Sequence, residues 1–223
     1  MVTGVVPTDG PQRRVSLPAR WTLVVGGTWR TGGVEVVNRY HNWYCRSARW
    51  RRRLEQDVLP WVIGDAALGD DALEVGPGPG LTTDLLRVHA RRLTCIEVDS
   101  RLAGMLEERM AGTNVGVILG DATNMPFEDA RFSSAVSFTM LHHVPSVALQ
   151  DRLFREICRV LAPGALFMGS DSTASLRFRV NHFRDVGIAI DPATLSDRLT
   201  KAGFVEPRVS EAGHAFRFRA CRP

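Results

Sequence analysis

The sequence predicts an α/β fold: a doubly wound, mostly parallel sheet with helices on both faces. Three observations support this prediction. Short apolar runs that suit buried strands alternate about five times with segments of helical apolar spacing. Glycines cluster at 76–80, where the first apolar run passes into a helix. Acidic residues close the second run at Glu97 and follow the third at Asp121, as expected where strand ends face a ligand.

Length and composition suit one such domain with a small appendage. The chain has 223 residues, of which 44% are hydrophobic and 23% charged, and its formal net charge of +4 permits contact with nucleic acid without requiring it. We find no apolar run of the roughly 18 residues that a spanning helix needs, and no signal peptide. The four cysteines lie far apart. We therefore expect a reduced, cytoplasmic protein without membrane contact or a metal site.

The N-terminal part divides into two segments. Residues 1–33 are poorly patterned, so we expect an extension before a domain at 34–223. A helical lid is predicted at 36–61, where aromatic and apolar residues recur at three- and four-residue steps. Arginines crowd this lid, and two interpretations stay open for them: an anion-binding face over a site, or a solvated helix face, which we favour. The aromatic residues Tyr40 and Trp43 suit either interpretation equally.

A glycine-rich turn follows the predicted strand at 73–75. Gly76, Gly78 and Gly80 bend the backbone, and helical spacing begins at Leu81. Such a turn points backbone N–H groups and the positive end of a helix at a ligand. The G-x-G-x-G spacing differs from the dinucleotide fingerprint, and no phosphate-loop lysine follows it. The turn alone is a weak signal, so its meaning depends on the strand ends that come after it.

Two carboxylates are predicted at the same sheet edge as this turn. Glu97 ends the strand at 93–97, about 20 residues beyond the first glycine, where an acid accepts hydrogen bonds from ribose hydroxyls in nucleoside-binding folds. Asp121 follows the strand at 115–119, where a carboxylate suits an exocyclic amine such as that of adenine. The sequence therefore predicts a nucleoside site at the carboxyl ends of these strands.

His142 and His143 follow a fourth predicted strand at 132–138. Either one of them activates or positions a substrate, or both are bonded to loop carbonyls, and we favour the second interpretation. His182 lies among arginines in an irregular stretch, where a solvated loop is favoured over an acid-binding role. The remaining predicted elements are a helix at 147–161, a strand at 165–169, a helix capped by Asp191, and strands at 203–205 and 214–221.

Together these motifs resemble the class I S-adenosylmethionine-dependent methyltransferases. The resemblance covers roughly 36–222 and implies a Rossmann-like, seven-stranded sheet whose last strand is inserted antiparallel. It also implies S-adenosyl-L-methionine as cofactor. The segments that carry it are Leu73 to Gly80, Ile96 to Asp99, Gly120 to Ala122, Phe132 to His143, Arg159 to Ala165 and Ala202 to Phe204.

The resemblance assigns each cofactor contact to a residue. The glycines would line the methionyl part, and Glu74 would support their loop and bind near the amino group. Glu97 would hold the ribose and Asp121 the adenine amine. The full set implied is Glu74, Gly76, Gly78, Gly80, Glu97, Val98, Asp121, Ala122, Ser137 and Phe138, the last two below the sulfonium.

Two serines depart from the family pattern. The fourth strand ends in Ser137 with no aspartate, and Ser133 replaces a frequent aspartate. The expected reaction is in-line methyl transfer to a small molecule, with His142 and His143 as the catalytic candidates. We disfavour nucleic acid as a partner because the fourth strand lacks an Asn-Pro-Pro-Tyr-type segment, and a homodimer is compatible with the sequence.

Two alternatives remain open at the level of sequence. The Ile-Glu-Val-Asp stretch at 96–99 and the basic helix near residue 50 resemble ribosomal RNA adenine dimethylases, which favours an RNA methyltransferase. The missing acid of the fourth strand favours a protein that binds S-adenosylmethionine without catalysis.

Overall fold

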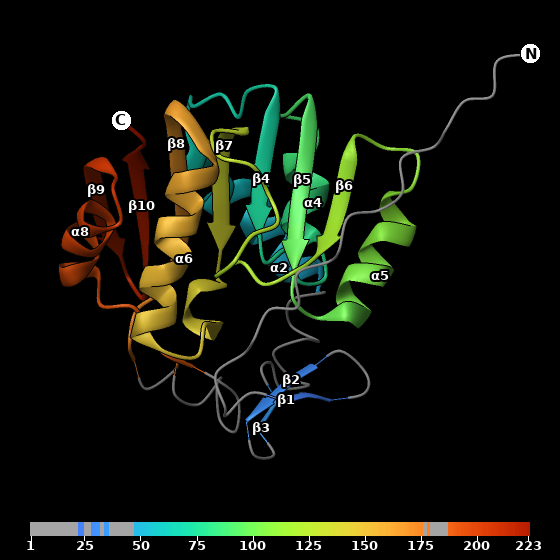
Figure 1. The fold of residues 1–223 in the computed structure, drawn as a ribbon, viewed down its shortest axis with the longest axis horizontal. Helices are drawn as coiled ribbons and strands as arrows, with labels where there is room; N and C mark the ends of the chain where they lie inside the picture. Colours follow the sequence, from blue (N-terminus) through green and yellow to red (C-terminus); the bar gives the residue numbers. More distant parts are fainter. Residues whose placement is uncertain (1–21, 25–27, 32–33, 36–46, 176–177, 179–186) are drawn as a thin grey trace, which may run out of the picture.

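The computed structural model describes residues 22–24, 28–31, 34–35, 47–175, 178 and 187–223, and its centre is a seven-stranded sheet (Figure 1). The strand order is β6-β5-β4-β7-β8-β10-β9. All neighbouring pairs are parallel except those of β10, which runs antiparallel to both β8 and β9. This confirms the predicted fold class and the inserted last strand. The strands are β4 (Asp71–Val75), β5 (Arg92–Glu97), β6 (Val115–Leu119), β7 (Phe132–Phe138), β8 (Leu161–Ser172), β9 (Val205–Ala212) and β10 (Ala215–Cys221).

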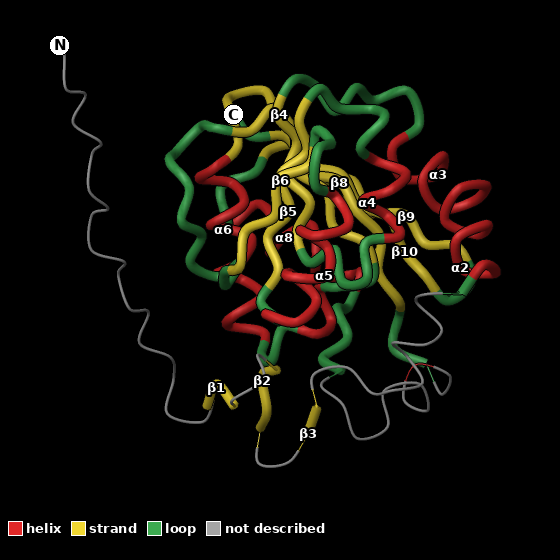
Figure 2. The backbone as a smooth tube through the Cα atoms, turned by 90° about the vertical axis from the view of Figure 1, so that its right-hand side faces the viewer, coloured by secondary structure: helices red, strands yellow, loops and turns green. Residues whose placement is uncertain are grey.

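Helices cover both faces of the sheet, with α6 on one side and α2 and α3 on the other (Figure 2). Strand residues alternate between the two faces: Leu73 belongs to the buried cluster under α6 and α8, and Ala72 to the cluster under α3, α4 and α5. The helices are α2 (Ala48–Arg53), α3 (Leu59–Ile63), α4 (Leu81–Leu86), α5 (Ser100–Met110), α6 (Val147–Val160) and α8 (Pro192–Lys201), with a π-helical turn at Leu54–Val58.

Most predicted boundaries agree with the structure to within a few residues. Asp191 caps α8 as expected, accepting a hydrogen bond from the backbone N–H of Ala193 at 3.0 Å. The helix predicted to end at 161 ends at Val160, and the strand predicted at 165–169 lies within the longer β8, which begins directly at Leu161. The described residues do not include the lid aromatics Tyr40 and Trp43 or the acid-binding candidate His182.

A small antiparallel sheet extends from the segment expected to be an extension, 1–33, into the first residues of the expected domain. Its strands are β1 (Thr22–Val24), β2 (Thr28–Thr31) and β3 (Val34–Glu35). None of the three pairs with a strand of the seven-stranded sheet in the described part of the chain. This small sheet is therefore separate in its hydrogen bonding from the main sheet.

The strand order creates a switch point between β4 and β7. From β4 the chain moves outward through β5 to β6, then crosses back to β7 on the other side of β4. At such a point the connections after neighbouring strands leave in opposite directions and open a crevice at the carboxyl ends of the strands. The glycine loop follows β4, and the two histidines follow β7. They therefore border the crevice from its two sides.

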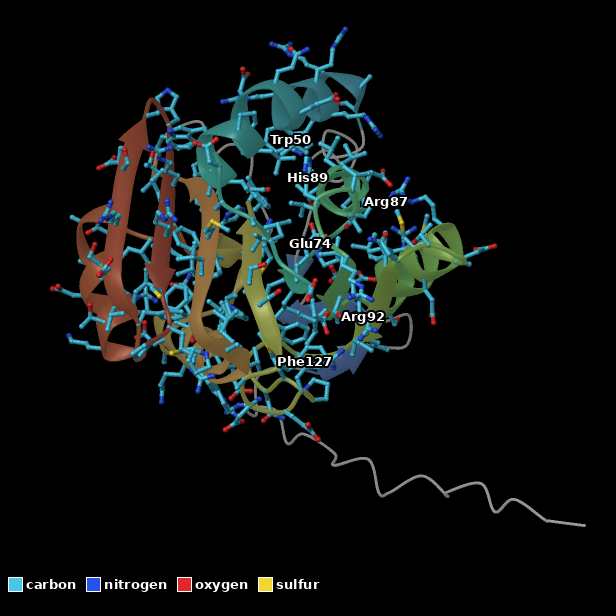
Figure 3. All side chains as sticks on the ribbon, turned by 90° about the horizontal axis from the view of Figure 1, so that it is seen from above. Trp50, Glu74, Arg87, His89, Arg92 and Phe127 are labelled. Atoms are coloured by element: carbon cyan, nitrogen blue, oxygen red, sulfur yellow. The ribbon has the colours of Figure 1, made fainter. Side chains whose placement is uncertain are left out.

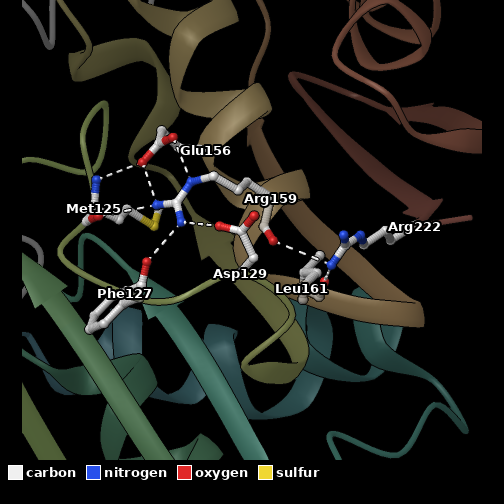
Figure 4. Close-up of polar contacts among 7 residues, drawn as sticks. All are labelled: Met125, Phe127, Asp129, Glu156, Arg159, Leu161 and Arg222. Carbon is white, nitrogen blue, oxygen red and sulfur yellow. Dashed lines mark hydrogen bonds and ion pairs between the residues drawn. The ribbon is translucent and has the colours of Figure 1, made fainter.

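The segment that crosses from β6 to β7 is held by Arg159 (Figure 4). Its guanidinium donates to the backbone carbonyls of Met125 at 3.1 Å and Phe127 at 2.7 Å, and it pairs with Glu156 and Asp129. Glu156 in turn accepts a hydrogen bond from the backbone N–H of Met125 at 2.8 Å. Met125 and Phe127 are buried in the cluster under α6. A single side chain on α6 thus fixes a crossover that has no helix of its own.

Candidate functional site

The turn after β4 has the backbone of a tight glycine loop. Its three glycines have φ values of +68°, +55° and +80°, which favour glycine strongly. A Cβ atom on Gly76 would collide with Met140, and one on Gly80 with Leu106 and Arg109. A Cβ on Gly78 would meet nothing within 4 Å. The middle of the loop therefore faces open space, and its backbone is accessible to a ligand.

Arg109 on α5 clamps this loop from the side. Its Nη2 donates to the carbonyl oxygens of Pro79 at 3.0 Å and Gly80 at 3.2 Å, and its Nη1 contacts Asp84 at 2.6 Å. The N–H groups of the three glycines donate to Ile96, Glu97 and Pro77, so these bonds and the Arg109 clamp together fix the shape of the loop. Sequence reasoning missed Arg109, since an arginine in the last turn of a helix is an ordinary surface residue without the tertiary contact.

Glu74 lies beneath the loop and is 1% exposed. Its carboxylate accepts hydrogen bonds from the hydroxyls of Thr82 and Thr83, the latter at 2.6 Å, and from the thiol of Cys95 at 3.4 Å. Burial raises the pKa of Glu74, although these hydrogen bonds oppose the shift. Burial also raises the pKa of the Cys95 thiol, and the neighbouring Glu74 adds to that effect. Glu74 ties β4 to the start of α4 and supports the loop from inside.

Glu97 ends β5 and is 6% exposed. Its carboxylate accepts three backbone N–H bonds, from Gly78 at 3.0 Å, Val98 at 2.9 Å and Asp99 at 3.0 Å. Burial raises the pKa of Glu97 in spite of these donors. The structure therefore joins the Glu97 carboxylate directly to the middle of the glycine loop, and the same carboxylate holds the backbone of Val98.

Asp121 stands at the next strand end. The backbone N–H of Gly120 donates to the carbonyl of Glu97 at 2.9 Å, which holds the turn after β6 beside the end of β5. The Asp121 side chain accepts from the backbone N–H of Thr123 at 2.8 Å and is partly exposed, and Ala122 packs on the cluster under α6. Gly78, Glu97 and Asp121 thus follow one another along a single sheet edge.

Ser137 and Phe138 do not point the same way. Phe138 belongs to the cluster under α3 to α5, whereas Ser137 alternates to the other face with Ala135. The Ser137 hydroxyl is fully buried and is the one buried side-chain polar atom in the described ranges without a hydrogen-bond partner. Buried hydroxyls are nearly always hydrogen-bonded, and a polar group of a bound ligand would supply a partner for this one.

Ser133, at the other end of β7, has a structural position. Its hydroxyl contacts the carbonyl oxygens of Leu68 and Asp71, each at 2.9 Å, and the backbone N–H of Asp71 at 3.0 Å. It therefore joins the beginning of β7 to the beginning of β4, away from the carboxyl edge.

His142, which follows β7, forms a buried pair with Asp171 near the carboxyl end of β8. Its Nδ1 contacts one carboxylate oxygen of Asp171, and its backbone N–H donates to the other at 3.2 Å. Both side chains are about 1% exposed or less. The ring of His143 lies 4.1 Å from that of His142, centroid to centroid. Sequence reasoning missed Asp171, although an acid at a strand's carboxyl end was the signal that identified Glu97.

Elsewhere, the described residues show no metal-binding cluster, and the hollow that they show lies away from the glycine loop. No group of three or more His, Cys, Asp or Glu side chains in this part of the chain is placed to hold a metal ion. A hollow at the amino ends of β4 and β5 is lined by paired charges, with Arg92 and Asp71 at 3.8 Å, and lies at the opposite edge from the glycine loop. None of the described helices is long and apolar enough to cross a membrane.

A family model described as "Methyltransferase domain" matches residues 73–169, the stretch from the glycine loop to β8. Among solved structures, the N-methyltransferase NodS from Bradyrhizobium japonicum, determined with S-adenosylhomocysteine, aligns with a TM-score of 0.66 at 18% identity. The alignment covers 84% of this chain and 94% of NodS. At that identity the likeness shows a shared fold.

Curated relatives carry more specific names. Ribosomal RNA small subunit methyltransferase A from Deinococcus radiodurans is 34% identical over 86 residues, covering 39% of this chain and 30% of that protein. A probable S-adenosylmethionine-dependent methyltransferase from Mycolicibacterium smegmatis is 28% identical over 161 residues, covering 70% of this chain and 59% of that one. The chain therefore spans less than two thirds of the length of these relatives.

The expectation that nucleic acid is disfavoured as a partner is wrong. Matched relatives from several organisms carry the name of an enzyme that modifies ribosomal RNA. The expectation was based on the missing Asn-Pro-Pro-Tyr-type segment after β7. The absence of that segment argues only against a planar base amine as the acceptor. Other acceptor atoms of RNA are unaffected by it.

Proposed function

We propose that this chain, which carries a class I S-adenosylmethionine-dependent methyltransferase domain, transfers a methyl group from S-adenosyl-L-methionine to an acceptor bound on the β7 side of the crevice. One observation carries the proposal: the glycine loop, Glu97 and Asp121 converge on one sheet edge beside the switch point. The loop leaves open space at Gly78 for the close approach of a ligand, and the two acids present acceptors, which suits the amino acid, sugar and base parts of this cofactor.

The residues present fit the cofactor by two physical criteria. The space over Gly78 is open in a loop whose neighbouring glycines are tightly packed, and the buried Ser137 hydroxyl has no protein partner among the described residues. The glycine loop would hold the methionyl part, Glu97 the ribose and Asp121 the adenine amine. The bound cofactor supplies an electrophilic methyl group, so the protein has mainly to align the acceptor and exclude water.

Calorimetry with S-adenosylmethionine tests cofactor binding. Glu97→Ala removes the ribose acceptor and is expected to weaken affinity tenfold or more, or about 1.4 kcal/mol. Glu107→Ala, on the exposed face of α5, is the matched control and should bind like the unmodified chain. Equal affinities for the two variants would remove Glu97 from the site.

RNA is the acceptor class that we propose first. The names of the relatives support it, and so do the arginines of α2, the helix that carries Trp50 (Figure 3). Four of the six residues of α2 are arginines, and α2 has no buried residue. Arg51 of this helix reaches Asp84 of α4 at 3.7 Å, so α2 lies beside the helix that the glycine loop begins.

Salt dependence tests the RNA proposal. The replacement of Arg52 and Arg53 together by Gln should lower affinity for structured RNA and reduce the slope of log affinity against log salt by about 1 to 2. The replacement of Arg155 and Arg208 is the control, since these arginines lie on α6 and β9. Salt-independent binding, or no methylation of RNA by the unmodified chain, would contradict an RNA acceptor.

A small-molecule acceptor is the second candidate, favoured by the residues after β7. Ser137, Phe138, Thr139 and Met140 stand where an RNA adenine dimethylase would have its Asn-Pro-Pro-Tyr-type segment, and they offer no amide and ring pair to a base amine. Transfer of labelled methyl to members of a panel of phenols, amines and carboxylic acids, with none to RNA, would support this candidate over the first.

A further inference from the structure

We propose that the loop between α4 and β5, residues 87–92, is a second RNA-binding element, which contacts backbone phosphates at the edge of the sheet opposite the crevice. This inference rests on the proposed RNA acceptor and deepens it, because it names a part of the chain that binds the RNA away from the methylated nucleotide. Two observations carry it. Three of the six loop residues are arginines and a fourth is histidine, and a single side chain braces the loop backbone.

The loop is held in one shape by Asn114, which directly precedes β6. The Nδ2 atom of this residue lies within hydrogen-bond distance of the carbonyl oxygens of Arg87 at 2.8 Å, Ala90 at 2.9 Å and Arg91 at 3.4 Å. The loop nevertheless projects from the surface, since the side chain of Val88 is 69% exposed. A loop that is ordered before binding loses less conformational entropy when a ligand engages it.

Most of the basic side chains in this loop have no acidic partner in the protein. Arg92 pairs with Asp71 at 3.8 Å. In the described part of the chain, Arg87, His89 and Arg91 make no ion pair. Guanidinium groups bind phosphate through charge-assisted and often bidentate hydrogen bonds. A nucleic acid backbone, which carries a charge at every step, can engage several such groups on one loop.

The loop continues the basic surface of α2 along the side of α4. Arg51 of α2 reaches Asp84 of α4 at 3.7 Å. Arg87 follows Asp84 by three residues and still donates its N–H to the helix, so the two side chains share a face of α4. The charge of Asp84 is already engaged, because Arg109 also contacts it at 2.6 Å. The arginines of α2 and of the loop therefore lie at the two ends of one short helix.

The length of β5 sets the size of the RNA that could reach both places. Arg92 begins this strand and Glu97 ends it at the crevice. Six residues at about 3.3 Å each separate the two ends by about 17 Å. An RNA duplex needs roughly five or six base pairs to cover that distance, at about 3 Å of axis per pair. The loop should therefore contact the stem of a structured RNA whose target nucleotide enters the crevice, and phosphate contacts of this kind carry no sequence information.

Salt titrations of the full chain with two RNA hairpins test the loop. The replacement of Arg87, His89 and Arg91 together by Gln should weaken binding of a hairpin with a stem of about 20 base pairs about tenfold. It should also lower the slope of log affinity against log salt by about 2, because two permanent charges are lost. A hairpin with a stem of about four base pairs does not reach the loop, so its affinity should stay within about twofold. Binding of S-adenosylmethionine should be unchanged, which also shows that the variant is folded.

A matched control removes the same residue types from exposed positions elsewhere, on α6 and in the turn between β9 and β10: Arg152→Gln, Arg155→Gln and His214→Gln. This triple variant should bind both hairpins like the unmodified chain. Equal affinity of the two triple variants for the long hairpin would overturn the inference and leave the RNA acceptor intact. An equal loss on the long and the short hairpin would overturn it too, because the loop would then lie within reach of the crevice.

Two single substitutions separate the charge of the loop from its shape. Asn114→Ala removes the brace and no charge, so it should weaken binding of the long hairpin about threefold with an unchanged salt slope. Asp70→Asn removes an exposed acid that lines a hollow with Arg91 and should strengthen binding about twofold, whereas Asp197→Asn on α8 should not. Weaker binding in Asp70→Asn, or unaltered binding in Asn114→Ala, would overturn the inference.

Failure of the unmodified chain to bind either hairpin would contradict the RNA acceptor and this inference together. Vesicles that contain an anionic lipid distinguish a membrane surface from RNA as the source of the phosphates. Binding of such vesicles by the unmodified chain but not by the loop variant, without RNA binding, would assign the loop to a membrane and overturn the inference.

Discussion

The two sides of the crevice are lined by different kinds of groups. On the β4 side, backbone groups predominate: three glycines with positive φ, a carboxylate that accepts three backbone N–H bonds, and the clamp of Arg109 on two carbonyls. On the β7 side, side chains predominate: the His142–Asp171 pair and the buried hydroxyl of Ser137. A backbone site suits a ligand common to a whole family, and side chains can be exchanged as the acceptor changes. The difference teaches that, under the proposed function, cofactor and acceptor would be recognised by separable means.

The largest expected effect is on the backbone side. Gly76→Ala forces a Cβ into Met140 at a φ of +68° and should cost about 2–4 kcal/mol of unfolding free energy, with loss of measurable cofactor binding. Gly112→Ala is the control, because its φ is +76° but nothing lies within 4 Å, so strain alone should cost about 1–2 kcal/mol. Chemical denaturation measures both. Equal losses would mean that the loop is no more tightly packed than an ordinary turn.

The next effect concerns the segment that joins the two sides. Arg159→Met removes the side-chain donor to the carbonyls of Met125 and Phe127 and leaves Glu156 only its backbone donor, and should cost about 2–4 kcal/mol. Arg155→Met removes a single exposed contact and should stay within about 0.5 kcal/mol. Hydrogen exchange should show faster opening confined to residues 120–131. Unchanged protection of these residues would show that Arg159 does not stabilise the crossover segment.

Cofactor affinity should depend on pH through Glu97. Burial raises the pKa of this carboxyl, so it gains a proton at a higher pH than an exposed glutamate does and then loses its capacity as a double acceptor. Affinity for S-adenosylmethionine should therefore fall about tenfold as the pH is lowered towards the ordinary glutamate range. Calorimetry across pH would show a flat profile in Glu97→Gln. A pH dependence retained in that variant would assign the effect to another group.

The smallest effect is on stability and belongs to Glu74. Because burial raises its pKa in the folded state, the folded protein binds more protons than the unfolded chain between the ordinary value of 4.5 and the raised one. The contribution of Glu74 to the unfolding free energy therefore falls as the pH rises through that window. Glu74→Gln should flatten this decline relative to the parent chain. An unchanged slope of denaturation midpoint against pH would contradict the raised pKa.

The sequence predicted the fold and the backbone side better than the side-chain side. Apolar periodicity and glycine spacing are local signals, so the succession of strands and helices and the glycine turn followed from residues close together in the chain, whereas the inserted last strand followed from the family resemblance. Asp171 lies 29 residues from His142 and Arg109 lies 29 residues from Gly80, and their importance comes only from contacts that the fold creates. The expectation about nucleic acid was wrong for a different reason. The absence of an Asn-Pro-Pro-Tyr-type segment argues against a base amine as acceptor, and it was taken to argue against RNA altogether.

The position of β10 bears on how the chain reaches its final form. β10 is near the end of the sequence but sits between β8 and β9, and Phe216 and Phe218 fill the cluster beneath α6 and α8. Until a ribosome has released these residues, β8 presents an open apolar edge, and β9 has no strand to join. The nascent chain should consequently be prone to aggregate between the synthesis of β8 and that of β10, and a deletion that removes β10 should be far more damaging than its length suggests.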